Sequence, residues 1–194
     1  MLSVSTFTTL ALLPFVFAAP TMKRAEVCDI SSLQAVSIVT SGDNSGQVRW
    51  DLFQDSGYGI QAGELAWFKE SNPDEPATFS AVPSSNGQGI FSFQRQTDFQ
   101  QVVQSGNGFS AAGSGGTEFI VSCNAECNTG AASTQLAAGG CTMEIADGTG
   151  KGTGNCITYG GGDQTPVTIS QCNGSASQSI TFYAAGSSFD EDDA

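Results

Sequence analysis

Short apolar runs separated by clusters of turn-forming residues recur along most of this chain. Each of five such runs stands next to a segment rich in Gly, Ser, Asn or Asp. They cover residues 36–39, 47–53, 90–93, 119–121 and 167–169. Glycine is abundant, with 24 residues in 194. Short strands punctuated by turns predict an all-β fold, either a sandwich or a small barrel.

The N-terminal residues follow a different pattern. Residues 10–17 form an apolar run that is followed by the small residue Ala18. The run is too short to span a bilayer, so it predicts a cleaved secretory signal peptide over residues 1–18. The dibasic pair Lys23 and Arg24 resembles the site that kexin-type proteases cut in fungal pro-proteins. We therefore expect a short pro-segment over residues 19–24 and a secreted mature chain of fungal type that begins at Ala25.

The C-terminal end carries a dense cluster of negative charge. Residues 190–193 are four consecutive acids, and they predict a disordered acidic tail over residues 187–194 because like charges repel. Residues 25–186 are then expected to form a single all-β domain. No apolar tail follows a small-residue site, so neither a GPI anchor nor another membrane anchor is expected.

Charge narrows the set of expected partners. After Arg24 the chain has 19 acidic residues and four basic ones, which gives the mature protein a net charge of about −15. Phosphate contacts need Lys and Arg, so nucleic acid and anionic membrane surfaces are not expected as partners. Solubility is the simplest consequence of such a charge.

Six cysteines fit the secretory context. An even number in an exported chain favours disulfides over metal ligation, and the absence of histidine weakens a zinc site further. Six cysteines allow 15 pairings, so spacing alone leaves connectivity open. Cys28 is far from the others and would tie the mature N-terminus to the body of the domain. The expected disulfide cysteines are Cys28, Cys123, Cys127, Cys141, Cys156 and Cys172.

Residues 154–182 carry the most specific motif of the chain. Gly-Asn-Cys-Ile-Thr-Tyr-Gly begins at Gly154, Pro-Val-Thr-Ile-Ser-Gln-Cys-Asn-Gly begins at Pro166, and Gln-Ser-Ile-Thr-Phe begins at Gln178. This segment resembles one repeat of a ricin-B-type β-trefoil lectin. The resemblance implies a β-trefoil, a Cys156–Cys172 disulfide between adjacent strands and carbohydrate binding. The rest of the chain is unmatched, so a β-sandwich or another small β-barrel stays an alternative.

The motif also departs from the pattern of that family. Ile180 stands where Trp is usual, and no aspartate follows Cys156 at the place where sugar-binding repeats have one. The candidate sugar site of this repeat is therefore Tyr159 for stacking, with Asp163 and Asn173 for contacts to hydroxyl groups. Asn173 also begins the only N-glycosylation sequon, which predicts a glycan on a surface loop.

Catalytic motifs are scarce. A chain without histidine cannot form a Ser-His-Asp catalytic triad or a Cys-His dyad. The sequence also has no phosphate-binding loop and no zinc-binding motif. No metal and no cofactor is expected. The aromatic residues Trp50 and Trp67 offer surfaces on which sugars stack, although large aromatic side chains are more often part of a core.

Three functions remain after these exclusions. The motif favours a secreted, non-catalytic, lectin-like protein whose partners are glycans or cell-wall polysaccharide. The first alternative is a secreted cell-wall, surface or effector-like β-protein that has no sugar site. The second is a small secreted glycoside hydrolase, because two carboxylates across a groove suffice for that reaction and the chain has 19 acids.

Overall fold

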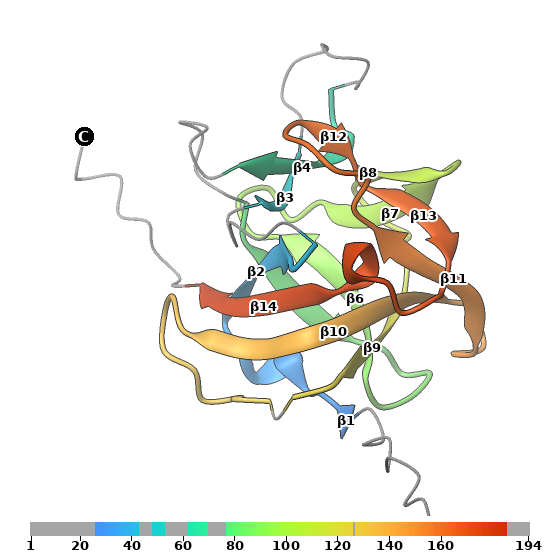
Figure 1. Cartoon of the computed structure of the whole chain (residues 1–194). Helices are drawn as coiled ribbons and strands as arrows, with labels where there is room; N and C mark the ends of the chain where they lie inside the picture. Colours follow the sequence, from blue (N-terminus) through green and yellow to red (C-terminus); the bar gives the residue numbers. More distant parts are fainter. Residues whose placement is uncertain (1–25, 43–47, 53–61, 70–76, 126, 186–194) are drawn as a thin grey trace, which may run out of the picture.

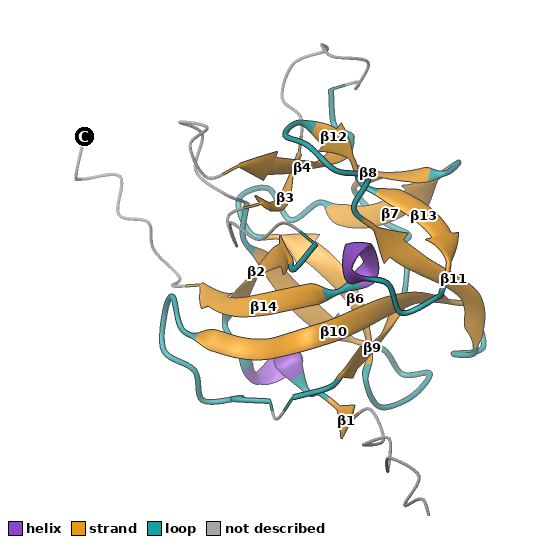
Figure 2. Ribbon diagram, in the orientation of Figure 1, coloured by secondary structure: helices purple, strands orange, loops and turns teal. Residues whose placement is uncertain are grey.

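The computed structural model describes residues 26–42, 48–52, 62–69, 77–125 and 127–185. The expected signal peptide, the pro-segment with Lys23 and Arg24, and the acidic tail lie outside these residues. The all-β prediction is confirmed: in these residues the regular structure consists of strands and two short 3₁₀ turns, η1 (Ile30–Ser32) and η2 (Ala176–Gln178). Figure 2 shows the strands as the dominant element. Within the described part of the chain, no helical segment has the length and apolar character needed to cross a bilayer.

Six antiparallel strands form a closed ring (Figure 1). In the order in which they pair, they are β2 (Ala35–Thr40), β5 (Phe79–Pro83), β6 (Ile90–Arg95), β9 (Phe119–Cys123), β10 (Leu136–Ala146) and β14 (Ile180–Ala185). β14 pairs back onto β2 over six residues, which closes the ring. Because each ring strand has two neighbours, the ring has no free edge strand.

Three hairpins lie beside the ring. They are β3 (Val48–Leu52) with β4 (Leu65–Lys69), β7 (Gln101–Ser105) with β8 (Gly108–Ala112), and β11 (Gly152–Thr158) with β13 (Thr168–Gln171). The short strand β12 (Thr165–Pro166) pairs with β4, and β1 (Glu26–Val27) pairs with β9. Along the chain, each hairpin stands between two ring strands. The order ring strand, hairpin, ring strand therefore occurs three times.

Aromatic side chains fill the space between the ring and the hairpins. Trp50 lies at their centre, with its ring centroid 6.0 Å from Trp67, 5.9 Å from Phe79 and 6.0 Å from Phe93. Both tryptophans are completely buried, so their role as core residues is confirmed. Because these rings come from several strands distant in sequence, their packing links the first hairpin to the ring.

The three hairpins also contact one another. The amide of Val167 donates to the carbonyl of Leu65 at 3.0 Å, and the amide of Ala111 donates to the carbonyl of Gly63 at 2.9 Å. The indole Nε1 of Trp67 donates to the carbonyl of Thr158 at 3.4 Å. These bonds join the three hairpins into one layer.

All six cysteines form disulfides. The predicted Cys156–Cys172 bond is present and joins the third hairpin to the residue that follows it. Cys123 and Cys141 connect the neighbouring ring strands β9 and β10, where they are register partners. Cys28 pairs with Cys127 across 99 residues, which confirms that it ties the N-terminal segment to the body of the domain.

Candidate functional site

Tyr159 does not have the exposed ring that the sequence motif led us to expect. It is only 8% exposed, and its ring packs edge-on against Trp67 with centroids 5.6 Å apart. Its hydroxyl accepts from the amide of Gly162 at 2.7 Å and donates to the carbonyl of Gly162 at 3.1 Å. The expectation of an exposed stacking ring at Tyr159 is therefore wrong: the ring belongs to the core, and its hydroxyl closes a tight glycine loop.

The other two residues of the predicted sugar site are exposed. Asp163 accepts a hydrogen bond from the amide of Lys69 at 2.8 Å, which connects the third hairpin loop to β4. Asn173 uses its side-chain oxygen to accept from the amide of Ser175 at 2.9 Å. Its exposure agrees with the predicted surface loop, whereas glycosylation of Asn173 stays a prediction. Each of these residues thus has a local structural role, and among the described residues neither of them forms a hydrogen bond with Tyr159.

Gln178, which begins the last segment of the motif, has a structural role that the sequence did not reveal. It is almost completely buried, and its Nε2 donates to the carbonyl of Gln171 and to the hydroxyl of Ser170, both at 2.9 Å. Its Oε1 accepts from the amide of Asn173 at 2.8 Å. A buried amide with such complete pairing fixes geometry. Gln178 therefore anchors the third hairpin to the start of β14.

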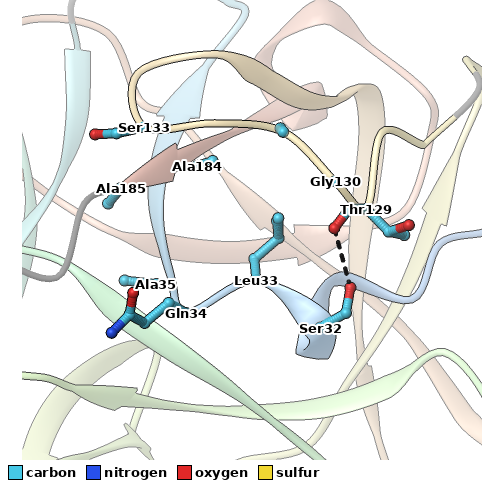
Figure 3. A pocket seen from close by; sticks show the side chains of 10 residues that line it. Ser32, Leu33, Gln34, Ala35, Thr129, Gly130, Ser133, Ala184 and Ala185 are labelled. Atoms are coloured by element: carbon cyan, nitrogen blue, oxygen red, sulfur yellow. Dashed lines mark hydrogen bonds between the residues drawn. The ribbon is translucent and has the colours of Figure 1, made fainter.

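A cavity of about 430 Å³ lies elsewhere, beside the start of β2 and the end of β14 (Figure 3). Three segments far apart in sequence form it: residues 32–35, residues 129–133 in the loop before β10, and the last two residues of β14. Its volume falls within the range of small-molecule sites. The lining residues are Ser32, Leu33, Gln34, Ala35, Thr129, Gly130, Ala131, Ser133, Ala184 and Ala185.

A disulfide joins two walls of this cavity. Cys28 lies just before η1 and residues 32–35, and Cys127 lies just before the loop that carries Thr129 and Ser133. The hydroxyl of Ser32 also donates to the carbonyl of Thr129 at 3.4 Å, as the dashed line in Figure 3 marks. The Cys28–Cys127 bond therefore limits how far the two walls can separate.

The loop over residues 128–135 is fixed at its other end as well. The amide of Thr134 donates to the carbonyl of Ala184 at 2.6 Å, and the amide of Ala184 donates to the carbonyl of Gln135 at 2.9 Å. At the start of the loop, the amide of Asn128 donates to the carbonyl of Ala137 at 2.7 Å. These bonds hold the loop against β10 and β14, so the cavity has a defined shape before any ligand arrives.

The cavity has an apolar floor and an uncharged polar rim. Leu33, Ala35 and Ala184 are buried, whereas Ser32, Gln34, Thr129 and Ser133 are exposed, and none of the lining residues is charged. Among the described residues, the side chains of Gln34, Thr129 and Ser133 have no hydrogen-bond partner. Hydroxyl and amide groups both donate and accept. The rim can therefore bond a neutral, polyhydroxylated ligand that rests on an apolar surface.

One group of sulfur atoms resembles a metal site. The Sγ atoms of Cys28, Cys123 and Cys127 lie within 4.8 Å of one another. Each of these cysteines belongs to a disulfide. Metals are bound by thiolates, so these sulfurs are not available as ligands in the oxidised protein.

No sequence motif marks the cavity. Its residues are common small and polar types, and they come together only when β2, β14 and the loop before β10 are placed side by side. Cys28 gave the one usable signal, because a cysteine isolated from the others requires a partner distant in sequence. The sequence therefore predicted that the N-terminal segment is attached to the domain, but not that Cys127 is the point of attachment.

Comparison with known proteins adds information on the fold. The sequence matches no family model and no curated protein. Among solved structures, the chain is similar to part of a protein described in a study of the structure and mode of action of a mosquitocidal holotoxin. That match has 14% identity and a TM-score of 0.52 over 79% of this chain. The chain spans only 17% of the length of that protein.

A second similar structure is that of the Haemophilus ducreyi cytolethal distending toxin. It has 14% identity and a TM-score of 0.49, over 89% of this chain and 94% of the matched one. At such low identity, the first match shows a shared fold and nothing about activity, and the second is too distant to carry an argument.

Proposed function

We propose that this chain is a β-trefoil of the ricin-B type. The closed ring of six strands and the three hairpins support this assignment, since ring strands and hairpin alternate in the same order three times along the chain. The Cys156–Cys172 bond and the anchoring role of Gln178 support it at the level of residues. Both lie in the segment that resembles the family.

The protein acts, in this proposal, as a secreted, non-catalytic carbohydrate-binding protein. The observation that carries the proposal is the cavity between residues 32–35 and 129–133, which combines an apolar floor with an uncharged rim of hydroxyl and amide groups. A saccharide has complementary chemistry, because its C–H groups are apolar and its hydroxyls donate and accept. The ligand of this cavity is therefore a neutral saccharide.

Secretion is part of the same proposal. Three disulfides support it, because disulfides form and persist in oxidising compartments. The signal sequence over residues 1–18 and the dibasic pair at Lys23 and Arg24 provide the route and the maturation step. Sequencing the N-terminus of the secreted form tests this step: a start at Ala25 supports it, and a start at Ala19 or Pro20 contradicts it.

A secreted effector-like protein without a sugar site is the second candidate. The burial of Tyr159 favours it, because the C-terminal repeat then has no exposed ring. The hydroxyl of Thr158, two residues after Cys156, also has a partner inside the hairpin, because it lies 2.7 Å from the hydroxyl of Ser170. The similarity to a segment of a mosquitocidal holotoxin is compatible with this candidate. A hydrolase is not proposed, since no carboxylate among the described residues lines the cavity.

Binding experiments with a matched pair of variants test the proposed function. The Thr129→Val and Ser133→Ala double variant removes two rim hydroxyls with little change in shape. Ser105→Ala removes an exposed hydroxyl on a distant hairpin and serves as the control. On an array of neutral and acidic glycans, the wild type and the control are expected to retain the same neutral saccharides, whereas the double variant loses them. Single-site affinity is expected on the order of millimolar, because the rim offers few polar groups. Equal retention by all three proteins would contradict the cavity as the site.

A further inference from the structure

Phe99 is the most exposed large apolar side chain among the described residues, with 69% of its surface accessible. It lies in the turn between β6 and β7, and its φ of 59° is in the left-handed region. This region is unfavourable for a residue with a Cβ and especially unusual for a bulky one. Glycine would fill the position without strain. The backbone conformation of this turn therefore does not explain why the position carries an exposed aromatic side chain.

The turn around Phe99 is fixed by hydrogen bonds on both sides. The amide of Phe99 donates to the carbonyl of Arg95 at 3.0 Å, and its carbonyl accepts from the side chain of Gln94 at 2.8 Å. Arg95 forms a two-bond ion pair with Asp98, and Asp98 also accepts from the amide of Gln100 at 3.1 Å. The backbone that carries the ring is therefore preorganised, which lowers the entropic cost of using it in binding.

The surroundings of the ring are polar and uncharged overall. Arg95 and Asp98 neutralise each other, and the side chains of Thr97 and Gln100 have no hydrogen-bond partner among the described residues. The other exposed large apolar residues, Val82 and Leu136, belong to β5 and β10 and not to this turn. A protein interface or a lipid surface would require a larger apolar patch. One isolated ring flanked by a hydroxyl and an amide instead suits a pyranose, which has an apolar face and hydroxyl edges.

The turn is also connected to the cavity. The Nε2 of Gln96 donates to the carbonyl of Gln34 at 2.8 Å, and Gln34 belongs to the cavity rim. The segment that presents Phe99 therefore contacts one wall of the cavity directly. A polysaccharide can engage both features, whereas a monosaccharide fills the cavity alone.

We propose that Phe99 is a stacking platform for a pyranose ring of a neutral polysaccharide, with Thr97 and Gln100 bonding its hydroxyls. This inference rests on the proposed carbohydrate function but uses a different part of the surface. Because two linked contacts raise avidity, Phe99 contributes most to the retention of long or insoluble chains.

Three substitutions at Phe99 test the platform, with retention on insoluble chitin, cellulose and β-1,3-glucan as the readout. Phe99→Gly removes both the ring and the strain, so it is expected to raise the melting temperature while retention falls on the order of tenfold or more. Phe99→Leu keeps an apolar side chain without a ring and is expected to lose retention as well. Phe99→Trp is expected to keep it. A variant that is at least as stable as the wild type cannot lose binding through unfolding.

The outcomes separate this inference from the proposed cavity. Titration with soluble monosaccharides is expected to be the same for Phe99→Gly and wild type, whereas the Thr129→Val and Ser133→Ala double variant loses that binding. Unchanged retention of Phe99→Gly on every polysaccharide that the wild type binds would overturn the platform. Full retention of Phe99→Leu would also overturn it, because a simple apolar contact would then suffice. Absence of wild-type retention on all three polymers overturns it too, even where monosaccharide titration upholds the cavity.

Discussion

At the scale of single residues, aromatic side chains divide into those that hold the fold and those that face solvent. From the sequence, Trp50 and Trp67 could either stack on sugars or belong to the core, which is the more frequent place for large aromatic side chains, and both are buried in the core. The motif assigned the exposed role to Tyr159, whereas among the described residues the exposed aromatic ring is that of Phe99. Exposure depends on which strands cover a residue, and the residues around Phe99 carry no glycine or proline that would signal a turn with positive φ. Neither the burial of Tyr159 nor the turn at Phe99 could therefore be predicted from local sequence.

Replacing Tyr159 tests its structural role. Tyr159→Ala is expected to lower the free energy of unfolding by about 3–5 kcal/mol, because it leaves a cavity against Trp67. Tyr159→Phe keeps the ring and removes the two bonds to Gly162, with an expected loss of about 0.5–1.5 kcal/mol. Urea unfolding measures both values. A stable Tyr159→Ala variant would show that the ring contributes little to the core.

The turn that carries Phe99 is expected to respond to acid. The hydrogen bonds from Arg95 hold the pKa of Asp98 below its ordinary value of 3.8. A carboxylate with a lowered pKa stabilises the folded turn above its ordinary pKa, and this contribution is lost as the pH falls through the folded value. The protection of the amides of residues 95–100, measured against their intrinsic exchange rates at each pH, should therefore fall only below about pH 3.8. In Asp98→Asn the same amides should exchange faster already at pH 6, where the wild type is protected; equal protection at pH 6 would contradict the ion pair.

At the scale of elements, the sequence predicted the strands better than the disulfide bonds between them. Each of the five apolar runs lies on or overlaps a strand, because a short apolar run bounded by turn-forming residues is a local property of the sequence. The Cys156–Cys172 bond followed from the family resemblance. The other two bonds could not be chosen, since four remaining cysteines still allow three pairings. Their choice depends on β1 lying against β9, and β9 against β10.

The Cys28–Cys127 and Cys156–Cys172 disulfides should differ in their effect on stability. In the chain-entropy account, the loop of 99 residues closed by Cys28–Cys127 is worth about 4.7 kcal/mol, and the loop of 16 residues closed by Cys156–Cys172 about 3 kcal/mol. We expect paired Cys→Ala variants to follow this order in thermal unfolding, with the reverse order as the contradicting result.

The same pair of disulfides should differ in their effect on binding. Only the Cys28–Cys127 variant loosens two walls of the cavity, so only that variant is expected to lose saccharide affinity at a temperature where both remain folded. A loss of saccharide affinity in the Cys156–Cys172 variant alone would place the sugar site in the third hairpin instead.

At the scale of the whole molecule, closure of the ring brings the site together. The cavity requires residues 32–35, 129–133 and 184–185, which adjoin only because β14 pairs with β2 and the loop before β10 is tied to Cys28. Such non-local contacts leave no periodic trace in a sequence. The strong negative charge, in contrast, can be read directly from the sequence, and it acts on every charged ligand that approaches.

Charge should therefore select among saccharides of similar shape. A chain with a formal net charge of −13 repels uronic acids and sialylated or sulfated sugars, whereas neutral sugars are unaffected. We expect affinity for an acidic saccharide to be lower than for its neutral counterpart, with the difference shrinking as salt rises from about 10 mM to about 1 M. Equal affinity for both at low salt would contradict an uncharged site on an acidic protein.

The central claim is that a neutral saccharide occupies the cavity between η1 and the loop over residues 128–135. Titration of the ¹⁵N-labelled mature protein with neutral mono- and disaccharides, followed through backbone amide shifts, tests it most directly. The account predicts saturable shifts at residues 32–35, 129–133 and 184–185, which disappear in the Thr129→Val and Ser133→Ala double variant. Shifts confined to residues 159–173, or no saturable shift at millimolar sugar, would contradict it.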